Sequence, residues 1–329
     1  MKLCVCVRSF LENPYLDFFI EYYVLLGFDK ILIFKSDTEP YSCDPKYEKY
    51  VNIINVNNSG NRILQENIHH IQHSGCDWTF FPDVDEILIL HKQYKNIKEF
   101  AEIKIREYPE INMFYFRWGT IEKYDIEKNN SFNDIIADYN IFKCRFIKSM
   151  VKTSCIKLLH DPHSCNINSN SVIYLEGSII NTNKSVHDIH DYSYNKDAVL
   201  IHIHTRSIHN IIIKSLYTVL NTKRILVLGD FINYINNFSE DKNIVLSFKN
   251  MIGQKAKLPF HHSTQDYISN IDISNYKILQ CKNNVIDVKK ENDLVKSILN
   301  KNNIDEEQYY IFVNALNKEI KENHRRFYK

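Results

Sequence analysis

The sequence predicts an α/β protein in which a mostly parallel β-sheet is flanked by helices, with a mainly helical extension at the C-terminus. Short apolar runs rich in β-branched residues alternate with segments of helical spacing along the first part of the chain. These runs stay apolar instead of alternating with polar residues, which is typical of strands covered on both faces in parallel sheets. We therefore expect residues 1–225 to form the α/β domain and residues 226–329 the extension.

The first part of the chain contains four expected strands, separated by helices with recognisable ends. The strands are expected at residues 2–7, 30–34, 50–56 and 78–81. The first helix has Asn13 as its expected N-cap, Pro14 at its first position and Gly27 as its stop. A second helix is expected from residue 62 to 74, with Gly75 after it.

Three further strands and a terminal helix are expected downstream. Residues 111–122 indicate a strand that runs into a loop, residues 141–151 a second strand, and residues 198–207 an alternating strand that ends in polar residues. Near the C-terminus, Asp305 and Gln308 are close to a capping box that precedes apolar residues at helical spacing. The extension is a candidate homodimer interface.

Composition and net charge limit the classes of binding partner that the sequence predicts. The chain has 44% hydrophobic and 25% charged residues, as a globular protein does. Its formal net charge of +1 favours neither nucleic acid nor an acidic membrane as the main partner. The eight cysteines form no CxxC pair, so a structural zinc site is not expected. The apolar runs are too short for a signal peptide or a membrane span, so we expect a cytoplasmic protein.

Three acids, Asp83, Asp85 and Glu86, directly follow the fourth expected strand. Pro82 lacks a backbone donor, so the regular strand should stop there and the acids should lie on the following turn. Open α/β sheets bind ligands beyond the carboxyl ends of their strands. Paired carboxylates on such a turn suit Mg²⁺ or Mn²⁺, and such a cation would neutralise a diphosphate leaving group.

Several stretches together resemble one known family. They are "NPYLDFFIEYYVLLGFDKILIF" from residue 13, "DWTFFPDVDEILIL" from residue 77, "FRWGT" from residue 116 and "LIHIHTRS" from residue 200. With them the chain resembles nucleotide-diphospho-sugar glycosyltransferases of the GT-A fold, a Rossmann-like fold, and in particular the family 2-like and family 92-like groups. The resemblance covers about the first 220 residues. The family usually has an acid after the second strand, where this chain has Lys35, followed by Asp37.

The resemblance implies that Asp83 and Asp85 bind a divalent metal and the donor diphosphate, with Asp85 favoured as direct ligand and Glu86 in support. His202 or His204 is a further candidate ligand; the two share one face of an alternating strand, so periodicity cannot separate them. Mn²⁺ is favoured over Mg²⁺. The implied donor is a UDP-sugar that supplies a hexose or an N-acetylhexosamine.

Other residues are candidates for donor contacts or for the catalytic base. Arg8, Asp37 and Arg206 are expected to contact the donor, with Lys214 as a further basic candidate. The resembled groups mostly invert the anomeric centre, which requires a carboxylate to deprotonate the acceptor hydroxyl. The candidate bases are Asp161 and Glu176, with Asp161 preferred. The acceptor is a glycan, a protein or a lipid-linked sugar.

Two other classes of function are compatible with the same residues. A metal-dependent phosphoesterase could use a mixed carboxylate and imidazole cluster. Its candidate ligands are Asp83, Asp85, His160, His163, His202 and His204. A non-catalytic carbohydrate-binding or assembly module is the third reading, since 13% of the residues are aromatic and can stack on sugars.

Overall fold

The fold is taken from a computed structural model of the full chain. It describes residues 1–57, 62–121, 136, 141–161, 164–167, 171–175, 178–182, 197–203, 209, 271–283 and 287–315.

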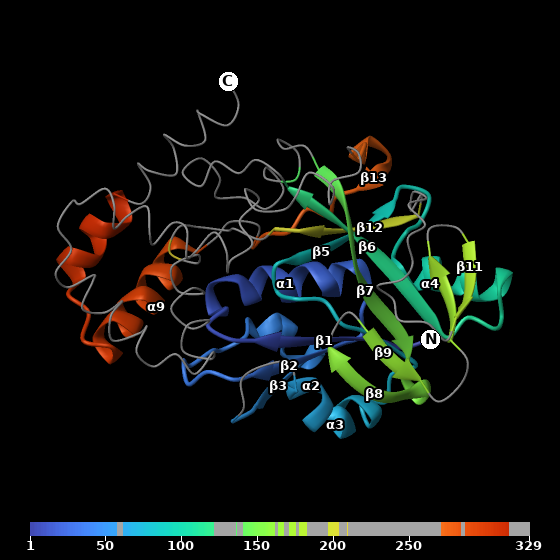
Figure 1. The fold of residues 1–329 in the computed structure, drawn as a ribbon, viewed down its shortest axis with the longest axis horizontal. Coiled ribbons are helices and arrows are strands. Elements are labelled where there is room, and N and C mark those ends of the chain that lie inside the picture. The colour runs from blue at the N-terminus through green and yellow to red at the C-terminus, as the bar shows by residue number, and fades with distance from the viewer. Residues whose placement is uncertain are drawn as a thin grey trace. The chain divides into compact units, whose positions relative to one another are not determined.

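An 11-stranded sheet forms the centre of the fold (Figure 1). Along the sheet the strands are β13 (Tyr276–Lys277), β5 (Glu86–His91), β12 (Ala198–His202), β6 (Met113–Ile121), β7 (Ile141–Lys152), β4 (Trp78–Phe80), β1 (Leu3–Ser9), β2 (Lys30–Lys35) and β3 (Val51–Asn55). A hairpin of β10 (Ser171–Leu175) and β11 (Ser178–Thr182) adds to β6. Strands β1 to β4 run parallel, β6 and β12 are parallel to each other, and β7 and β5 pair antiparallel with their neighbours. The predicted α/β class with a mostly parallel, helix-flanked sheet is confirmed.

Helices cover both faces of this sheet. Tyr23 of α1 (Asn13–Leu26) packs against Phe80, with ring centroids 6.0 Å apart. The next residue along the strand direction, Phe81, instead joins a core cluster with α2 (Ile63–Glu66) and α3 (Ile68–Gln72). Successive residues of an extended chain point to opposite faces, so α1 and α2–α3 lie on opposite sides.

Two helix expectations need correction. The N-cap of α1 is Glu12 and Asn13 is already helical; no side chain caps the helix start. Gly27 does end the helix as predicted, with a left-handed φ of 109°. The expected helix from residue 62 to 74 is two short helices that meet at Asn67, whose φ of −109° breaks the helical backbone. The Asn67 side chain donates to the Ile63 carbonyl, which satisfies an acceptor at that break.

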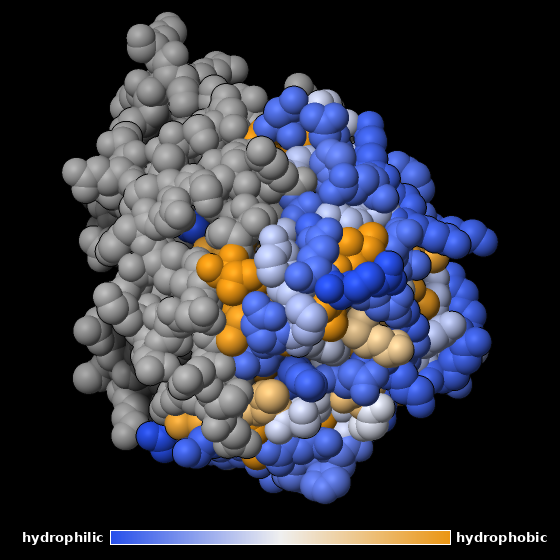
Figure 2. Space-filling view, turned by 90° about the vertical axis from the view of Figure 1, so that its right-hand side faces the viewer, coloured by the Kyte–Doolittle hydropathy of each residue, from blue (hydrophilic) through white to orange (hydrophobic). Residues whose placement is uncertain are grey.

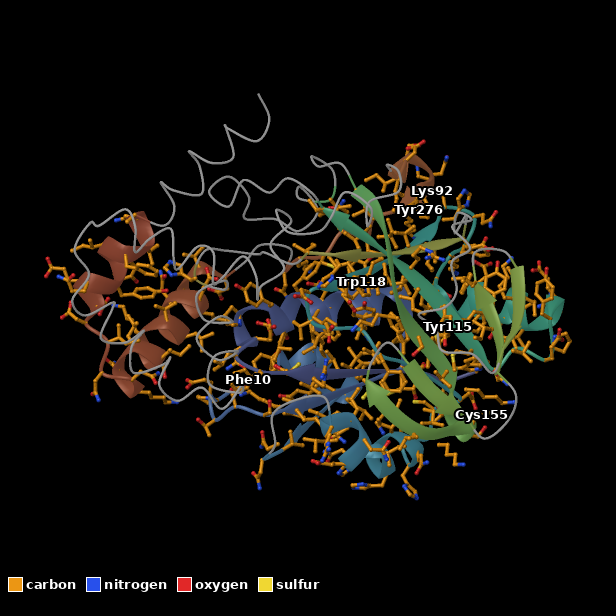
Figure 3. The ribbon with its side chains drawn as sticks, in the orientation of Figure 1. Phe10, Lys92, Tyr115, Trp118, Cys155 and Tyr276 are labelled. Carbon is orange, nitrogen blue, oxygen red and sulfur yellow. The ribbon has the colours of Figure 1, made fainter. Side chains whose placement is uncertain are left out.

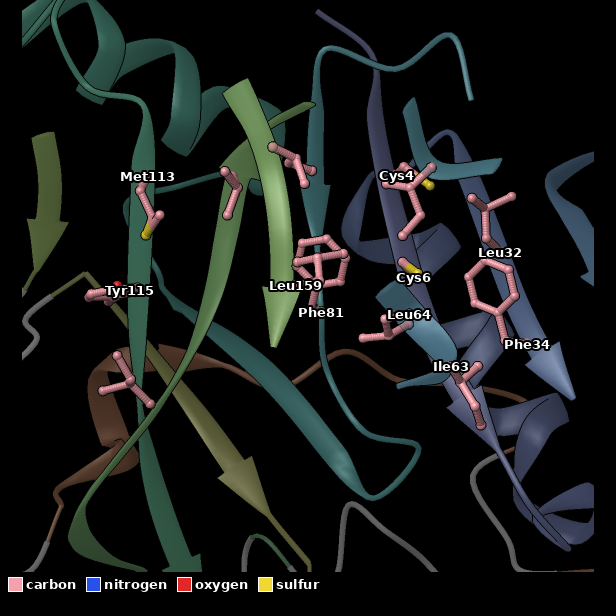
Figure 4. Packing of buried hydrophobic residues seen from close by; sticks show 14 of the residues in the cluster. Cys4, Cys6, Leu32, Phe34, Ile63, Leu64, Phe81, Met113, Tyr115 and Leu159 are labelled. Atoms are coloured by element: carbon pink, nitrogen blue, oxygen red, sulfur yellow. The ribbon is translucent and has the colours of Figure 1, made fainter. Parts of the chain in front are cut away.

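The core on the α2–α3 side is completed by a second, two-stranded sheet. Strands β8 (Ile156–Asp161) and β9 (Ser164–Ile167) pair antiparallel. Leu159 of β8 packs with Leu64 of α2 and with Cys6 and Phe34 of the main sheet (Figure 4). Another helix, α4 (Ile97–Glu107), buries Phe100 against the aromatic residues of β6. These layers hold the carboxyl ends of β1 and β4 in fixed positions.

Strand β6 carries an irregularity at Gly119 that matters for the candidate site. The register between β6 and β7 shifts between Arg117 and Gly119. A Cβ at Gly119 would lie 2.6 Å from Cγ2 of Ile141 and 3.2 Å from Cδ1 of Ile201. Only glycine therefore allows the three strands to pack this closely, and the neighbouring Trp118 is directed away from these isoleucines.

The chain divides into two compact units. Unit 1 comprises residues 1–123, 129–203 and 264–286, and unit 2 comprises 124–128, 204–263 and 287–329. Within unit 2, α9 (Val288–Lys301) is followed by a helix over residues 306–315 that Asp305 caps by accepting from the Gln308 amide at 2.8 Å, as predicted. In unit 1, β13 pairs with β5, so residues after 225 also contribute to the sheet. The domain boundary at residue 225 stays a prediction.

On the face that Figure 2 shows, most of the described surface is hydrophilic, with small hydrophobic areas between. Among the described residues, no helix has the length and apolar character needed to cross a lipid bilayer.

Candidate active site

The acidic turn lies where β4 leaves the sheet, as the sequence predicts. The last strand-like hydrogen bond is donated by the Phe81 amide to the Ser149 carbonyl at 3.1 Å. Pro82 has no N–H to continue the ladder. The chain therefore turns through Asp83 and Asp85, and it re-enters the sheet as β5 at Glu86.

A buried lysine on the neighbouring strand faces this turn. Phe80 of β4 pairs with Met150 of β7, so Lys148 lies just beyond the point where β4 ends. Its Nζ is 2.6 Å from Oδ2 of Asp83 and 3.6 Å from Oε1 of Glu86, and its side chain is 0% exposed. Lys148 was not among the residues predicted for the site. The sequence offered no signal that sets Lys148 apart, because β7 also contains Lys143, Arg145 and Lys152.

Arg8 of β1 faces the same carboxylate from the other side. Val5 pairs with Phe80, and the same parallel register continued by three residues sets Arg8 level with Asp83. One guanidinium nitrogen of Arg8 lies 3.5 Å from Oδ1 of Asp83, and the two side chains are 22% and 30% exposed. Burial opposes ionisation of Asp83, but Lys148 and then Arg8 outweigh it and hold the pKa of Asp83 well below its usual range.

Glu86 stabilises the turn through hydrogen bonds of its side chain and its backbone. Its Oε2 accepts from the Asp83 amide at 2.7 Å, and its own amide donates to the Asp83 carbonyl at 3.1 Å. Tyr23 of α1 donates to the Glu86 carbonyl at 3.0 Å. Burial raises the pKa of Glu86 well above its ordinary value, and the charges of Asp83 and Asp85 add to that shift while Lys148 opposes it.

Asp85 and His202 meet across β5 and β12. His202 is level with Glu86 in that antiparallel pair, and the Ile203 amide donates to the Asp85 carbonyl at 2.9 Å. This register brings Nε2 of His202 to 3.5 Å from Oδ1 of Asp85, and both side chains are nearly buried. The strand ends at His202, so the structure pairs this histidine with the acidic turn.

Trp118 lies against the histidine. Its ring is edge-on to His202 with centroids 4.1 Å apart, and Nζ of Lys148 lies 5.8 Å from the same ring. Figure 3 shows Trp118 where β6, β7 and β12 cross in the view, with Tyr115 farther along β6. Trp118 therefore contacts two residues of the site, the imidazole and the lysine.

Asp37, which the sequence predicts to contact the donor, forms hydrogen bonds that stabilise the loop after β1. Its carboxylate accepts from the amides of Leu11 at 2.8 Å and Glu39 at 3.0 Å, and it pairs with Lys35. The side chains of Lys35 and Asp37 are 3% and 4% exposed. Leu11 has a φ of 55°, which is costly for a residue with a branched side chain, so the bond from its amide helps to fix that conformation.

The remaining predicted site residues cannot be placed by their side chains. His163, Glu176, His204, Arg206 and Lys214 lie outside the described residues. His160 and Asp161 close strand β8, where the backbone alone is described. The carboxylate proposed as base and the second candidate histidine thus stay predictions.

The described residues provide some of the ligands that a divalent cation needs. Among the described residues, no group of three or more His, Cys, Asp or Glu side chains could hold a metal ion. Asp83 fits poorly as a direct ligand because each of its oxygens faces a protein cation. Asp85 and His202 fit better, since a carboxylate oxygen and an imidazole nitrogen at this separation can share one ion of the Mn²⁺ type.

Comparisons with known proteins give distant structural similarity only. The sequence matches no protein-family model and no curated protein. Among solved structures, S. aureus TarS is 9% identical over 47% of this chain and 29% of its own, with a TM-score of 0.29. A structure of residues 1–349 of S. aureus TarS is 12% identical over 78% of both chains, with a TM-score of 0.33. A CMP:2-keto-3-deoxy-manno-octonic acid synthetase with CTP is 13% identical over 46% of this chain and 75% of its own, with a TM-score of 0.26.

The first of these comparisons spans less than a third of the TarS chain.

Proposed function

We propose that the protein is a metal-dependent glycosyltransferase that moves a sugar from a UDP-sugar to a hydroxyl acceptor. The observation that supports this most is the contact between Asp85 on the acidic turn and His202 at the end of β12, at the carboxyl ends of parallel strands. That edge is where open α/β sheets bind nucleotides. The GT-A-like character suggested by the sequence motifs fits the same edge.

Asp85 and His202 are the residues that would hold the cation. Mn²⁺ is favoured because it accepts both carboxylate and imidazole ligands. When bound, such an ion supplies positive charge to the diphosphate as the glycosyl bond breaks. His204, which alternates with His202 in the sequence, remains a candidate third ligand.

Arg8 would contact the donor diphosphate directly. It projects from the carboxyl end of β1, its side chain is partly exposed, and its contact with Asp83 is long. A planar guanidinium can donate two parallel hydrogen bonds to phosphate oxygens. Arg206 and Lys214 are further proposed phosphate contacts; Asp37 would act on the donor through the loop after β1 that it fixes.

The transfer is proposed to invert the anomeric centre. Asp161, or else Glu176, would take the proton of the acceptor hydroxyl while the diphosphate leaves from the opposite face of the sugar. The transferred sugar is a hexose or an N-acetylhexosamine. The acceptor is a glycan, a protein or a lipid-linked sugar.

The test is a transfer and hydrolysis assay with a panel of UDP-sugars, run with Mn²⁺ and again after chelation. Release of UDP that requires both the metal and a hydroxyl acceptor supports the proposal. Cleavage of simple phosphate esters without use of any UDP-sugar indicates the phosphoesterase instead. Sugar binding without turnover of any donor indicates the non-catalytic module.

A further inference from the structure

Lys148 is a buried cation at the acidic turn that the proposed chemistry does not use. Resting on the proposed function, we propose that Lys148 is a positioning residue: it balances Asp83 permanently, so that Arg8 can turn from Asp83 to the donor diphosphate.

The two cations beside Asp83 differ in distance and in burial. Lys148 is 2.6 Å from one carboxylate oxygen and has no exposed side-chain surface. Arg8 is 3.5 Å from the other oxygen and is 22% exposed. The short, buried contact is the stronger one because water screens it little. Asp83 therefore depends mainly on Lys148.

This difference decides which cation can bind a ligand. Lys148 Nζ is enclosed by Asp83, Glu86 and the ring of Trp118, so a phosphate group cannot reach it without displacing them. Arg8 reaches the surface at the carboxyl end of β1. A diphosphate can thus draw the guanidinium away from Asp83 while that carboxylate keeps its partner.

Loss of Lys148 would change both the charge balance of Asp83 and the interactions of Arg8. Asp83 would remain as a partly buried carboxylate with Arg8 as its nearest cation, and removing one partner of a buried pair is strongly destabilising. Arg8 would then be held by Asp83. An arriving diphosphate would compete with that carboxylate for Arg8 and would meet its negative charge.

The experiment measures UDP affinity in the presence of Mn²⁺ by calorimetry, and kcat and KM for the donor, in a set of variants of the full chain. Lys148→Met keeps the length of the side chain and removes its charge. Lys148→Met combined with Asp83→Asn removes both charges. Lys152→Met is the matched control, since Lys152 is exposed on the same strand. Thermal unfolding is recorded for each variant.

Lys148→Met should weaken UDP binding by about 100-fold, which corresponds to roughly 2.7 kcal/mol. The double variant should recover at least about tenfold of that loss, and Lys152→Met should match the unaltered protein. Recovery on removing a second charge is not expected of a lysine that only fills space. If Lys148→Met fails to fold, the double variant carries the test, because Arg8 no longer faces the charge of Asp83 and UDP should bind within about tenfold of the unaltered protein.

Two results overturn the inference, and they are distinguishable from failure of the proposed function. If the unaltered protein binds UDP and Lys148→Met binds it equally well, Lys148 has no positioning role. If the double variant binds UDP as weakly as Lys148→Met does, or worse, charge balance is not what Lys148 supplies. If the unaltered protein binds neither UDP nor any UDP-sugar, the proposed function is wrong, and the positioning role of Lys148, which depends on that function, is wrong as well.

Discussion

Nζ of Lys148 lies 2.6 Å from Oδ2 of Asp83, although the two residues are 65 positions apart in the sequence. The contact exists because β4 ends at Phe80 while β7 continues past it. The two aspartates of the turn consequently have different surroundings. Asp83 faces lysine and arginine, whereas Asp85 faces a histidine.

Replacing Asp37 by alanine should lower the free energy of unfolding by about 3 kcal/mol, because buried Lys35 would lose its charged partner. The Leu11 and Glu39 amides would lose their acceptor as well. Urea unfolding measures the change, with Glu110→Ala as a control at an exposed carboxylate. Unchanged stability together with lost UDP binding would instead make Asp37 a direct donor contact.

Gly119→Ala should destabilise the protein by about 2–3 kcal/mol, the upper part of the range typical of overpacking, since the new Cβ would overlap Ile141 in a packed core. Gly75→Ala is the matched control. It has a φ of 74° but no atom within 4 Å of the added Cβ, so only backbone strain of about 1 kcal/mol is expected. Equal losses for the two variants in urea unfolding would contradict the packing explanation.

Cys76 should react with iodoacetamide at a rate that rises with pH and levels off above about pH 8. A hydrogen bond from Cys4 is the main cause that lowers the pKa of Cys76 to about 7, and Ser74 and Lys30 add to it. The thiolate is the nucleophile, so the rate is half-maximal near pH 7 and falls tenfold for each unit below. Mass spectrometry of the labelled peptides gives the rates; buried Cys6, whose pKa is raised by burial, serves as the unreactive comparison. A midpoint near pH 9 for Cys76 would refute this.

A comparison of kcat for Asp161→Asn and Glu176→Gln at saturating donor concentration should show which of the two residues is the catalytic base. The variant that removes the base should lose at least about 100-fold in kcat, because general base catalysis contributes roughly that much. Its affinity for UDP should not change, since the base acts on the acceptor. Full transfer by both variants would exclude both residues from this role.

Much of the fold could be predicted from local sequence. Strands β1 and β2 are built around the apolar runs that predict them, and Gly27 ends α1 where predicted, because these signals depend on neighbouring residues. The break at Asn67 was not predicted. The Ile63 carbonyl accepts from both the backbone amide and the side chain of Asn67, and the first helix ends there within an otherwise regular helical pattern.

The site was predictable to a smaller extent, because its contacts depend on strand register. The acidic turn followed from Pro82 and the apolar strand before it. Periodicity could not choose between His202 and His204; the pairing of β12 with β5 brings His202 to Asp85. Lys148 was missed because its burial depends on the early end of β4, a distant segment. The donor contact of Asp37 stays a prediction; its bond to Leu11 was not predicted, because it depends on how the loop after β1 folds back.

The most direct measurement of the central claim is calorimetric titration of UDP into the protein with Mn²⁺ and after chelation, repeated with Asp85→Asn. If Asp85 and His202 hold the cation that receives the diphosphate, the unaltered protein should bind UDP at least about tenfold more tightly with Mn²⁺, and Asp85→Asn should abolish that difference. Equal UDP affinity with and without the metal in the unaltered protein, or a metal effect that survives Asp85→Asn, would contradict the account.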